Sequence, residues 1–204
     1  MYIRNKKHKW LYRLQNLITT ITTDTSILFG GVTYPNQKPE KEKLLRWKYG
    51  NERESISLSE RLKNPYHFVF TWNLLLKKEI LSKHHFPYNV KDYGYEDVVF
   101  IKQLKENNIL VQHIENRLVH FNTETSLTFI EKTEKAVSTL HQLILDKKLE
   151  LSDTKIGKVY KVVKFWQLNF LISFFFKKVS KNMIKNLTSS NPSLIVLDLY
   201  KLGY

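Results

Sequence analysis

The chain has 204 residues, and its 33 Lys and Arg residues against 19 Asp and Glu residues give a formal charge of 33 − 19 = +14. Apolar residues make up 42% and charged residues 25%, which is typical of globular proteins and excludes a disordered or fibrous chain. The absence of Cys excludes disulfide frameworks, zinc–thiolate sites and thiol catalysis, and no apolar run approaches the roughly 20 residues of a membrane span.

The first third of the chain predicts a helix and a broken strand. Apolar residues recur at helical spacing over residues 10–21. Residues 26–34 (SILFGGVTY) read as a short buried strand interrupted by Gly30 and Gly31, where the backbone must turn or approach another group closely. The next elements in chain order are a polar loop over 35–43, a short helix or turn over 44–50 and a charged helical segment over 51–63.

The middle of the chain alternates strands and helices. The aromatic segment 66–72 (YHFVFTW) predicts a strand, and residues 96–106 predict a helix that begins just after Gly94. The clearest helix is predicted over 126–146, with Thr128 and Glu131 at the spacing of a capping box at its start. The shorter elements expected here are a helix over 77–83, a loop over 84–93, and strands over 109–114 and 118–120. Such interleaving favours an α/β arrangement.

The C-terminal segment 155–186 is helical by pattern, with an apolar stretch over 165–176 and lysines around it. That stretch is too short to span a bilayer. Two interpretations remain open. The segment is either a helix that packs on the core or an interfacial helix on anionic lipid, since Phe, Trp and Lys are the side chains that interfacial helices use.

Glu96 and Asp97 are the strongest candidates for catalysis, because both carboxylates lie at the predicted first turn of a helix. The N-terminus of a helix favours an ionised carboxylate, and an ionised carboxylate in a cleft can act as a general base on a hydroxyl group. The alternative is that both residues only cap the helix. His120 is the second candidate, as a metal ligand, although a single His is more often a hydrogen-bonded structural residue.

Six stretches, taken in order, resemble the C-terminal half of family 2 glycosyltransferases with the GT-A fold, especially bacterial members with a galactosyltransferase-like C-terminal segment. The stretches are FGGVTYP (29–35), LLRWKYGNERE (44–54), ERLKNPYHFVFTWNLLLKKEIL (60–81), YGYEDVVFIKQLKENNI (93–109), HIENRLVH (113–120) and LTFIEKTEKAVSTLHQLI (127–144). The resemblance implies a partial GT-A domain (αβα, mixed sheet) over residues 1–146, followed by a basic helical extension over 147–204.

The resemblance also implies an activity: inverting transfer of a sugar from a nucleotide-sugar donor to a hydroxyl of a glycan or polysaccharide acceptor, as in the biosynthesis of cell-envelope polysaccharides. Asp97 would be the general base, and Glu96 would orient the acceptor. His120 would contact a divalent cation, Mn²⁺ or Mg²⁺. Four residues would line the acceptor side: Gly94, Tyr95, Asn73 and Trp72. Arg46 and Trp47 recur in the likeness, which assigns them no role.

The family's nucleotide-binding first half, with its Asp-x-Asp metal pair, has no counterpart here, because only about 25 residues precede the first matching stretch. We therefore expect a missing N-terminal half as a partner, and a cation site without its usual carboxylates.

Net charge is +7 over residues 1–50, −1 over 51–146 and +8 over 147–204. This distribution favours an anionic membrane surface over nucleic acid as a partner. No secretory signal is visible, so a cytoplasmic protein is expected, peripheral on the inner face of the cell membrane. The alternative to an enzyme is a non-catalytic basic module that binds an anionic membrane or another polyanion.

Overall fold

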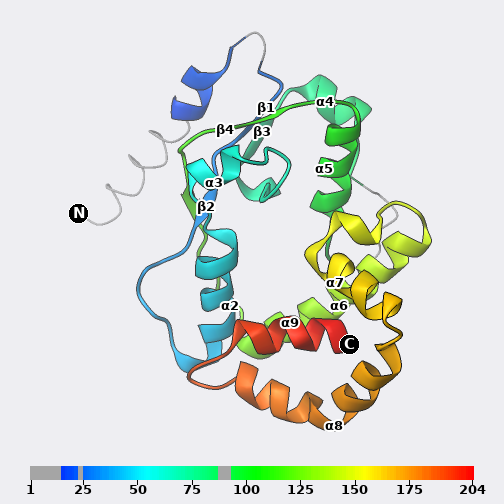
Figure 1. The fold of residues 1–204 in the computed structure, drawn as a ribbon. Coiled ribbons are helices and arrows are strands. Elements are labelled where there is room, and N and C mark those ends of the chain that lie inside the picture. Colours follow the sequence, from blue (N-terminus) through cyan, green and yellow to red (C-terminus); the bar gives the residue numbers. More distant parts are fainter. Residues whose placement is uncertain (1–14, 23–24, 87–92) are drawn as a thin grey trace.

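The computed structural model describes residues 15–22, 25–86 and 93–204. The described chain is a mixed α/β structure in which a small sheet lies at one end and helices make up the rest (Figure 1). The start of the helix predicted over residues 10–21 and most of the loop predicted over 84–93 lie outside the described residues. Residues 15–20 are helical.

The sheet is mixed, as the sequence predicted. Strand β1 (Ile27–Phe29) pairs antiparallel with β3 (Leu74–Leu76) and parallel with β4 (Val111–His113), which gives the strand order β3-β1-β4. After a turn at Gly30 and Gly31, β2 (Val32–Thr33) pairs in parallel with β5 (Leu118–Val119). The prediction of one strand broken by two glycines is therefore confirmed.

The strand predicted over residues 66–72 is wrong. Phe68 has a φ of 59°, in the left-handed region, and this breaks the extended backbone that a strand requires. The strand forms a few residues later, at β3. The side chain of Val69 is still buried in the sheet's core, together with Phe29, Phe100 and Leu104. The aromatic segment is therefore a loop that contributes Val69 to the core.

Helices α5 (Glu96–Glu106) and α6 (Ser126–Leu145) agree with the predicted ranges 96–106 and 126–146. The capping box predicted at Thr128 and Glu131 is wrong, because the N-cap of α6 is Thr125, whose hydroxyl accepts a hydrogen bond from the Thr128 backbone N–H at 3.1 Å. The remaining elements before residue 150 are the 3-10 helix Lys41–Lys43, α2 (Leu44–Tyr49), a π-helical turn over Gly50–Glu54, α3 (Leu58–Leu62), a 3-10 turn over Thr71–Asn73 and α4 (Lys78–Lys83).

The C-terminal segment forms three helices where the sequence predicted one. After a 3-10 turn over Leu151–Asp153 come α7 (Lys155–Phe165), α8 (Asn169–Leu187) and α9 (Leu194–Gly203). Helix α9, which the sequence pattern did not predict, packs on α2, α6 and α8 (Figure 1). Among the described residues, no helix combines the length and the apolar character needed to cross a bilayer.

A second core joins the two parts of the chain. Leu45 of α2 and Ile130 of α6 are buried against Leu187, Leu194 and Leu197 of the C-terminal helices. Lys48 on α2 also donates a hydrogen bond to the carbonyl oxygen of Pro192 at 2.9 Å. The division at residue 146 stays a prediction, and α8 and α9 share a core with the segment before it.

Candidate functional site

A tight turn at Gly94 and Tyr95 precedes α5, whose first turn carries the carboxylates of Glu96 and Asp97. Gly94 has a φ of +115°, a backbone conformation that residues with a side chain rarely adopt. A Cβ added there would lie 2.6 Å from the Cβ of Ala136 on α6. Glu96 closes the turn, because its Oε1 accepts a hydrogen bond from the Gly94 N–H at 3.0 Å. The hydroxyl of Thr139 donates to the carbonyl of Tyr93 at 3.1 Å. The turn is therefore held against α6.

Asp97 lies one residue further along, at the first turn of α5, and is half-buried. Burial raises the pKa of its carboxyl, the nearby charges of Glu96 and Glu54 raise it further, and a hydrogen bond from its own backbone N–H opposes them. Within the three described ranges, no other side chain donates a hydrogen bond to this carboxylate. Glu96 thus does the local capping, and Asp97 keeps hydrogen-bonding capacity for another group.

His120 follows β5 and is enclosed by aromatic rings. Its ring stacks on Trp72, with centroids 4.1 Å apart and planes 10° apart, and it meets Tyr34 edge-on at 5.4 Å. Burial lowers its pKa, and the charge of Arg46 lowers it further, against weaker opposing effects of Glu54 and others. The imidazole is therefore neutral near pH 7, with a nitrogen lone pair available.

The residues present do not by themselves form a cation site. Across the described part of the chain, no three His, Asp or Glu side chains come together as a metal-binding group. His120 alone would supply one ligand, whereas Mg²⁺ and Mn²⁺ take several oxygen ligands. We therefore derive no catalytic step that passes through a metal ion.

The other predicted acceptor residues differ in their surroundings. Asn73 is buried, and its amide donates hydrogen bonds of 2.8 Å to the carbonyls of Gly31 and Asn116. Its amide hydrogens hold the glycine turn to the segment before β5, which is a structural use. Trp72 is 41% exposed beside His120, and Tyr95 stands in the left-handed conformation at the N-cap of α5, with its pKa raised to about 12 by burial. Their acceptor role stays a prediction.

Arg46, to which the resemblance assigned no role, belongs to a buried polar network. Its Nη1 and Nη2 both donate to Glu54 Oε2 at 2.9 Å, and Nη2 also donates to the Tyr34 hydroxyl at 2.7 Å. The Tyr34 hydroxyl in turn donates to Glu54. Burial alone would lower the pKa of Arg46, but Glu54 and Tyr34 raise it above the usual range. Glu54 ends the matching stretch 44–54, but the sequence analysis assigned it no role, because nothing in the pattern of the π-helical turn that carries it relates it to Arg46.

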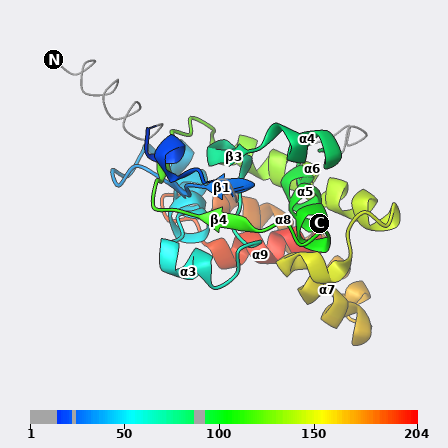
Figure 2. The same ribbon diagram turned by 90° about the horizontal axis from the view of Figure 1, so that it is seen from above.

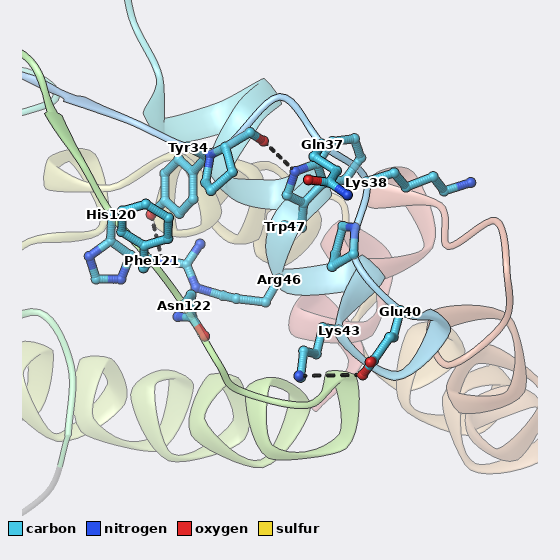
Figure 3. Close-up of a pocket in the computed structure, with 12 residues that line it drawn as sticks. Tyr34, Gln37, Lys38, Glu40, Lys43, Arg46, Trp47, His120, Phe121 and Asn122 are labelled. Atoms are coloured by element: carbon cyan, nitrogen blue, oxygen red, sulfur yellow. Dashed lines mark hydrogen bonds and ion pairs between the residues drawn. The ribbon is translucent and has the colours of Figure 1, made fainter. Parts of the chain in front are cut away.

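A partly open cavity of about 400 Å³ lies beside this network (Figure 3). The loop around Lys38 forms one wall, residues 120–122 form another, and Arg46 and Trp47 lie between them. The indole N–H of Trp47 donates to the carbonyl of Pro35 at 2.7 Å and so fixes the loop. The lining carries three cations and one carboxylate, a net charge of 3 − 1 = +2: Lys38, Lys43, Arg46 and Glu40.

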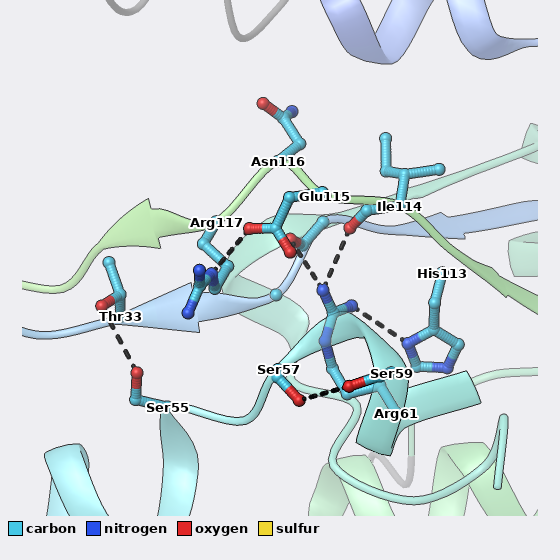
Figure 4. Close-up of polar contacts among 12 residues, drawn as sticks. Thr33, Ser55, Ser57, Ser59, Arg61, His113, Ile114, Glu115, Asn116 and Arg117 are labelled. Atoms are coloured by element: carbon cyan, nitrogen blue, oxygen red, sulfur yellow. Dashed lines mark hydrogen bonds and ion pairs between the residues drawn. The ribbon is translucent and has the colours of Figure 1, made fainter. Parts of the chain in front are cut away.

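A second polar cluster surrounds Arg61, which is 1% exposed (Figure 4). Its Nη1 approaches His113 Nδ1 at 3.1 Å and the Phe29 carbonyl at 3.3 Å, and its Nη2 donates to the carbonyls of Ile114 at 3.0 Å and Gly30 at 3.4 Å. His113 Nε2 lies 2.9 Å from the carbonyl of Pro65. A ring that donates there from Nε2 accepts from Arg61 at Nδ1, which is the neutral form.

Glu54 has a minor electrostatic effect on each of the two sequence-predicted residues: its charge adds to the raised pKa of Asp97 and opposes the lowering of the pKa of His120. His120 is among the residues that line the cavity, and Asp97 is not. Comparison of the chain with protein-family models, curated proteins and solved structures finds no match. The resemblance to glycosyltransferases therefore rests on the six sequence stretches alone.

Proposed function

We propose that this chain carries the acceptor side of an inverting glycosyltransferase of the GT-A type. Such an enzyme moves a sugar from a nucleotide-sugar donor to a hydroxyl of a glycan. The observation that carries the proposal is the Asp97 carboxylate, which is half-buried and receives no hydrogen bond from another described side chain. The second feature that supports it is the cavity lined by His120, Lys38, Lys43 and Arg46, whose positive charges suit a phosphate leaving group.

Asp97 would accept the proton of the acceptor hydroxyl. The hydroxyl oxygen would then attack the anomeric carbon, and the bond from that carbon to the leaving phosphate oxygen would break with inversion. A carboxylate whose pKa is raised by burial is a stronger base than an exposed one. Glu96 would act as a positioning residue, since its carboxylate fixes the turn that holds Asp97.

The cavity would receive the part of the donor that gains negative charge as the bond breaks. Lys38, Lys43 and Arg46 supply positive charge there, although Lys43 is paired with Glu40 and Arg46 with Glu54. This charge favours a diphosphate over a neutral group. Tyr34 and Glu54 hold the guanidinium of Arg46 in place.

Sugar transfer by the Asp97→Asn variant tests this proposal. Wild-type protein incubated with a panel of nucleotide-sugars and glycan acceptors should form a product detectable by mass spectrometry, and Asp97→Asn should lower its rate by about 10²-fold or more. The variant should melt no lower than the wild type, because the fold disfavours the ionised carboxylate. Asp146→Asn, at an exposed C-cap, is the matched control and should keep full activity.

Binding of the donor supplies a second measurement. Thermal unfolding is recorded with nucleoside diphosphates, with and without Mn²⁺, and a ligand present at 100 times its dissociation constant adds about 2.7 kcal/mol of stability. Equal rates for Asp97→Asn and wild type would exclude Asp97 as the base. The proposal for this chain would be contradicted if no product formed and no nucleotide raised the melting temperature.

A further inference from the structure

The corner between α7 and α8 is formed by a sharp helix ending. The Leu168 N–H bonds to the Val163 carbonyl at 2.9 Å and the Gln167 N–H bonds to the Lys164 carbonyl at 3.1 Å, while Gln167 has a φ of 55°. This is the Schellman pattern, in which one left-handed residue ends a helix. It splits the single helix predicted over 155–186 into α7 and α8 and turns the chain between them. The end of α7 lies at the outer edge of the molecule (Figures 1 and 2).

Large apolar side chains are exposed at this corner. Phe165 is 77% exposed, Trp166 66% and Phe170 78%. The exposed surface continues along α8 at positions one helical turn apart. We define the aromatic tip as six residues, each between 46% and 78% exposed: Phe165, Trp166, Phe170, Leu171, Phe174 and Phe175. A contiguous apolar patch of this kind marks an interaction site in a folded protein.

The opposite face of α8 already packs on the protein. Phe176 lies edge-on to Tyr200 of α9, with centroids 5.3 Å apart, and Met183 packs on the same core. The apolar residues of the predicted helix therefore lie on two faces of α8. Phe175 and Val179 are exposed, while Ile172 is half-buried. Packing on the core explains one face of α8 and leaves the aromatic tip without a function in the fold.

Positive charge surrounds the aromatic tip. Residues 155–185 contain eight lysines, and no Asp or Glu occurs between Asp153 and Asp198. All eight lysines are exposed. Lys164 directly precedes the tip and Lys177 follows it after Phe176. The Nζ of Lys178 lies 4.3 Å from the ring centroid of Phe174. Charged and apolar groups thus occupy one surface.

We propose that the aromatic tip inserts into the headgroup region of an anionic lipid membrane, with the flanking lysines bound to lipid phosphates. Phe and Trp side chains enter the boundary between headgroups and acyl chains, and lysines extend their ammonium groups to the phosphates. Charge complementarity selects anionic lipid over a second copy of this chain, whose tip would carry the same positive charge. The proposal does not rest on sugar transfer, so Asp97→Asn should bind vesicles like the wild type.

Sedimentation with lipid vesicles tests the proposal on the full chain. The protein should bind vesicles of phosphatidylglycerol mixed with phosphatidylcholine, bind pure phosphatidylcholine vesicles far less, and release from the mixed vesicles as salt rises. The emission of Trp166 should shift to shorter wavelength on binding, and Trp166→Phe should abolish that shift. The triple variant Phe165→Ser, Trp166→Ser, Phe170→Ser should bind at least about tenfold more weakly.

Matched variants separate the tip from general effects. Leu62→Ser, Leu127→Ser and Ile195→Ser replace apolar residues that are 55–70% exposed elsewhere, and together they should bind like the wild type. Reversal of Lys161, Lys164 and Lys177 to Glu should abolish binding. The same change at the exposed residues Lys78, Lys83 and Lys105 alters net charge equally and should have a smaller effect.

Three results would overturn the proposal. The first is no binding to anionic vesicles by a protein that unfolds cooperatively. The second is equal loss of binding in the tip variant and its control. The third is a dimer in solution that the tip substitutions dissociate, without vesicle binding, which would assign the aromatic tip to self-association.

Discussion

Among the described residues, Arg46 and Arg61 are both buried, at 5% and 1% exposure, and their partners differ. Arg46 is paired with a carboxylate, Glu54, and borders a cavity. Arg61 is held by backbone carbonyls and by His113, and its Nε has no hydrogen-bond partner. Glu54 raises the pKa of Arg46, whereas burial lowers that of Arg61.

The difference separates two uses of a buried guanidinium. Arg61 connects β1, β4 and the segment after β4, so its hydrogen bonds hold backbone that is far apart in sequence. Arg46 keeps its charge beside a cavity because a carboxylate stabilises it there. Arg61 therefore acts on the fold, and Arg46 can act on a ligand as well. This comparison predicts effects of different size in the two regions.

Arg61→Met should have the largest effect on stability. The substitution leaves buried carbonyls and His113 Nδ1 without a donor, and we expect a loss of about 3–5 kcal/mol in the free energy of unfolding. Urea denaturation measures it. Arg53→Met, which removes an exposed ion pair with Asp198, is the control and should cost less than about 1 kcal/mol. A small effect of Arg61→Met would mean that its hydrogen bonds do not stabilise the fold.

Glu54→Gln should have the second-largest effect, because it leaves the charge of Arg46 buried without a carboxylate. We expect a loss of about 2–4 kcal/mol by the same measurement. The double variant Arg46→Met, Glu54→Gln removes the unpaired charge and should recover much of that loss. If the double variant is less stable than the single one, the pair stabilises through packing and not through charge.

Acidification should have the smallest effect. Burial lowers the pKa of His113 and of His120 below the 6.5 of an unfolded chain, and Arg61 and Arg46 add to this. The unfolded chain then binds more protons than the folded one, so their contribution to stability is complete above pH 6.5 and is lost as pH falls below it. Asp97, with a raised pKa, acts in the opposite sense at lower pH.

Unfolding free energies between about pH 7.5 and 5.5 measure this dependence. His113→Gln and His120→Gln should each reduce the slope with pH. A slope that neither substitution changes would mean that other groups cause it.

Local sequence features predicted the helices with the strongest patterns. Helix α6 has a regular apolar stripe, and α5 begins after Gly94, whose left-handed conformation other residues rarely adopt. The break of one strand into β1 and β2 followed from Gly30 and Gly31. In each case the deciding interaction lies within a few residues of chain, which is why the sequence alone was sufficient.

Predictions that depended on distant contacts were less accurate. The aromatic segment 66–72 looked like a strand, but the left-handed Phe68 makes it a loop that buries Val69. Helix α9 was missed, because its position is set by packing on α2, α6 and α8. The Arg46–Glu54–Tyr34 network combines residues from β2's end, α2 and a π-helical turn, which no spacing rule relates.

The sequence by itself determined the mixed α/β class, the bounds of α5 and α6, and the choice of Asp97 and His120 as candidates. Only the tertiary structure decided that the Asn73 amide donates to the carbonyls of Gly31 and Asn116, that Glu54 pairs with Arg46 beside the cavity, and that one face of α8 stays exposed. The physical reason is range. Caps, turns and helical stripes are fixed by neighbours in sequence, whereas burial and electrostatic coupling depend on which distant segments pack together.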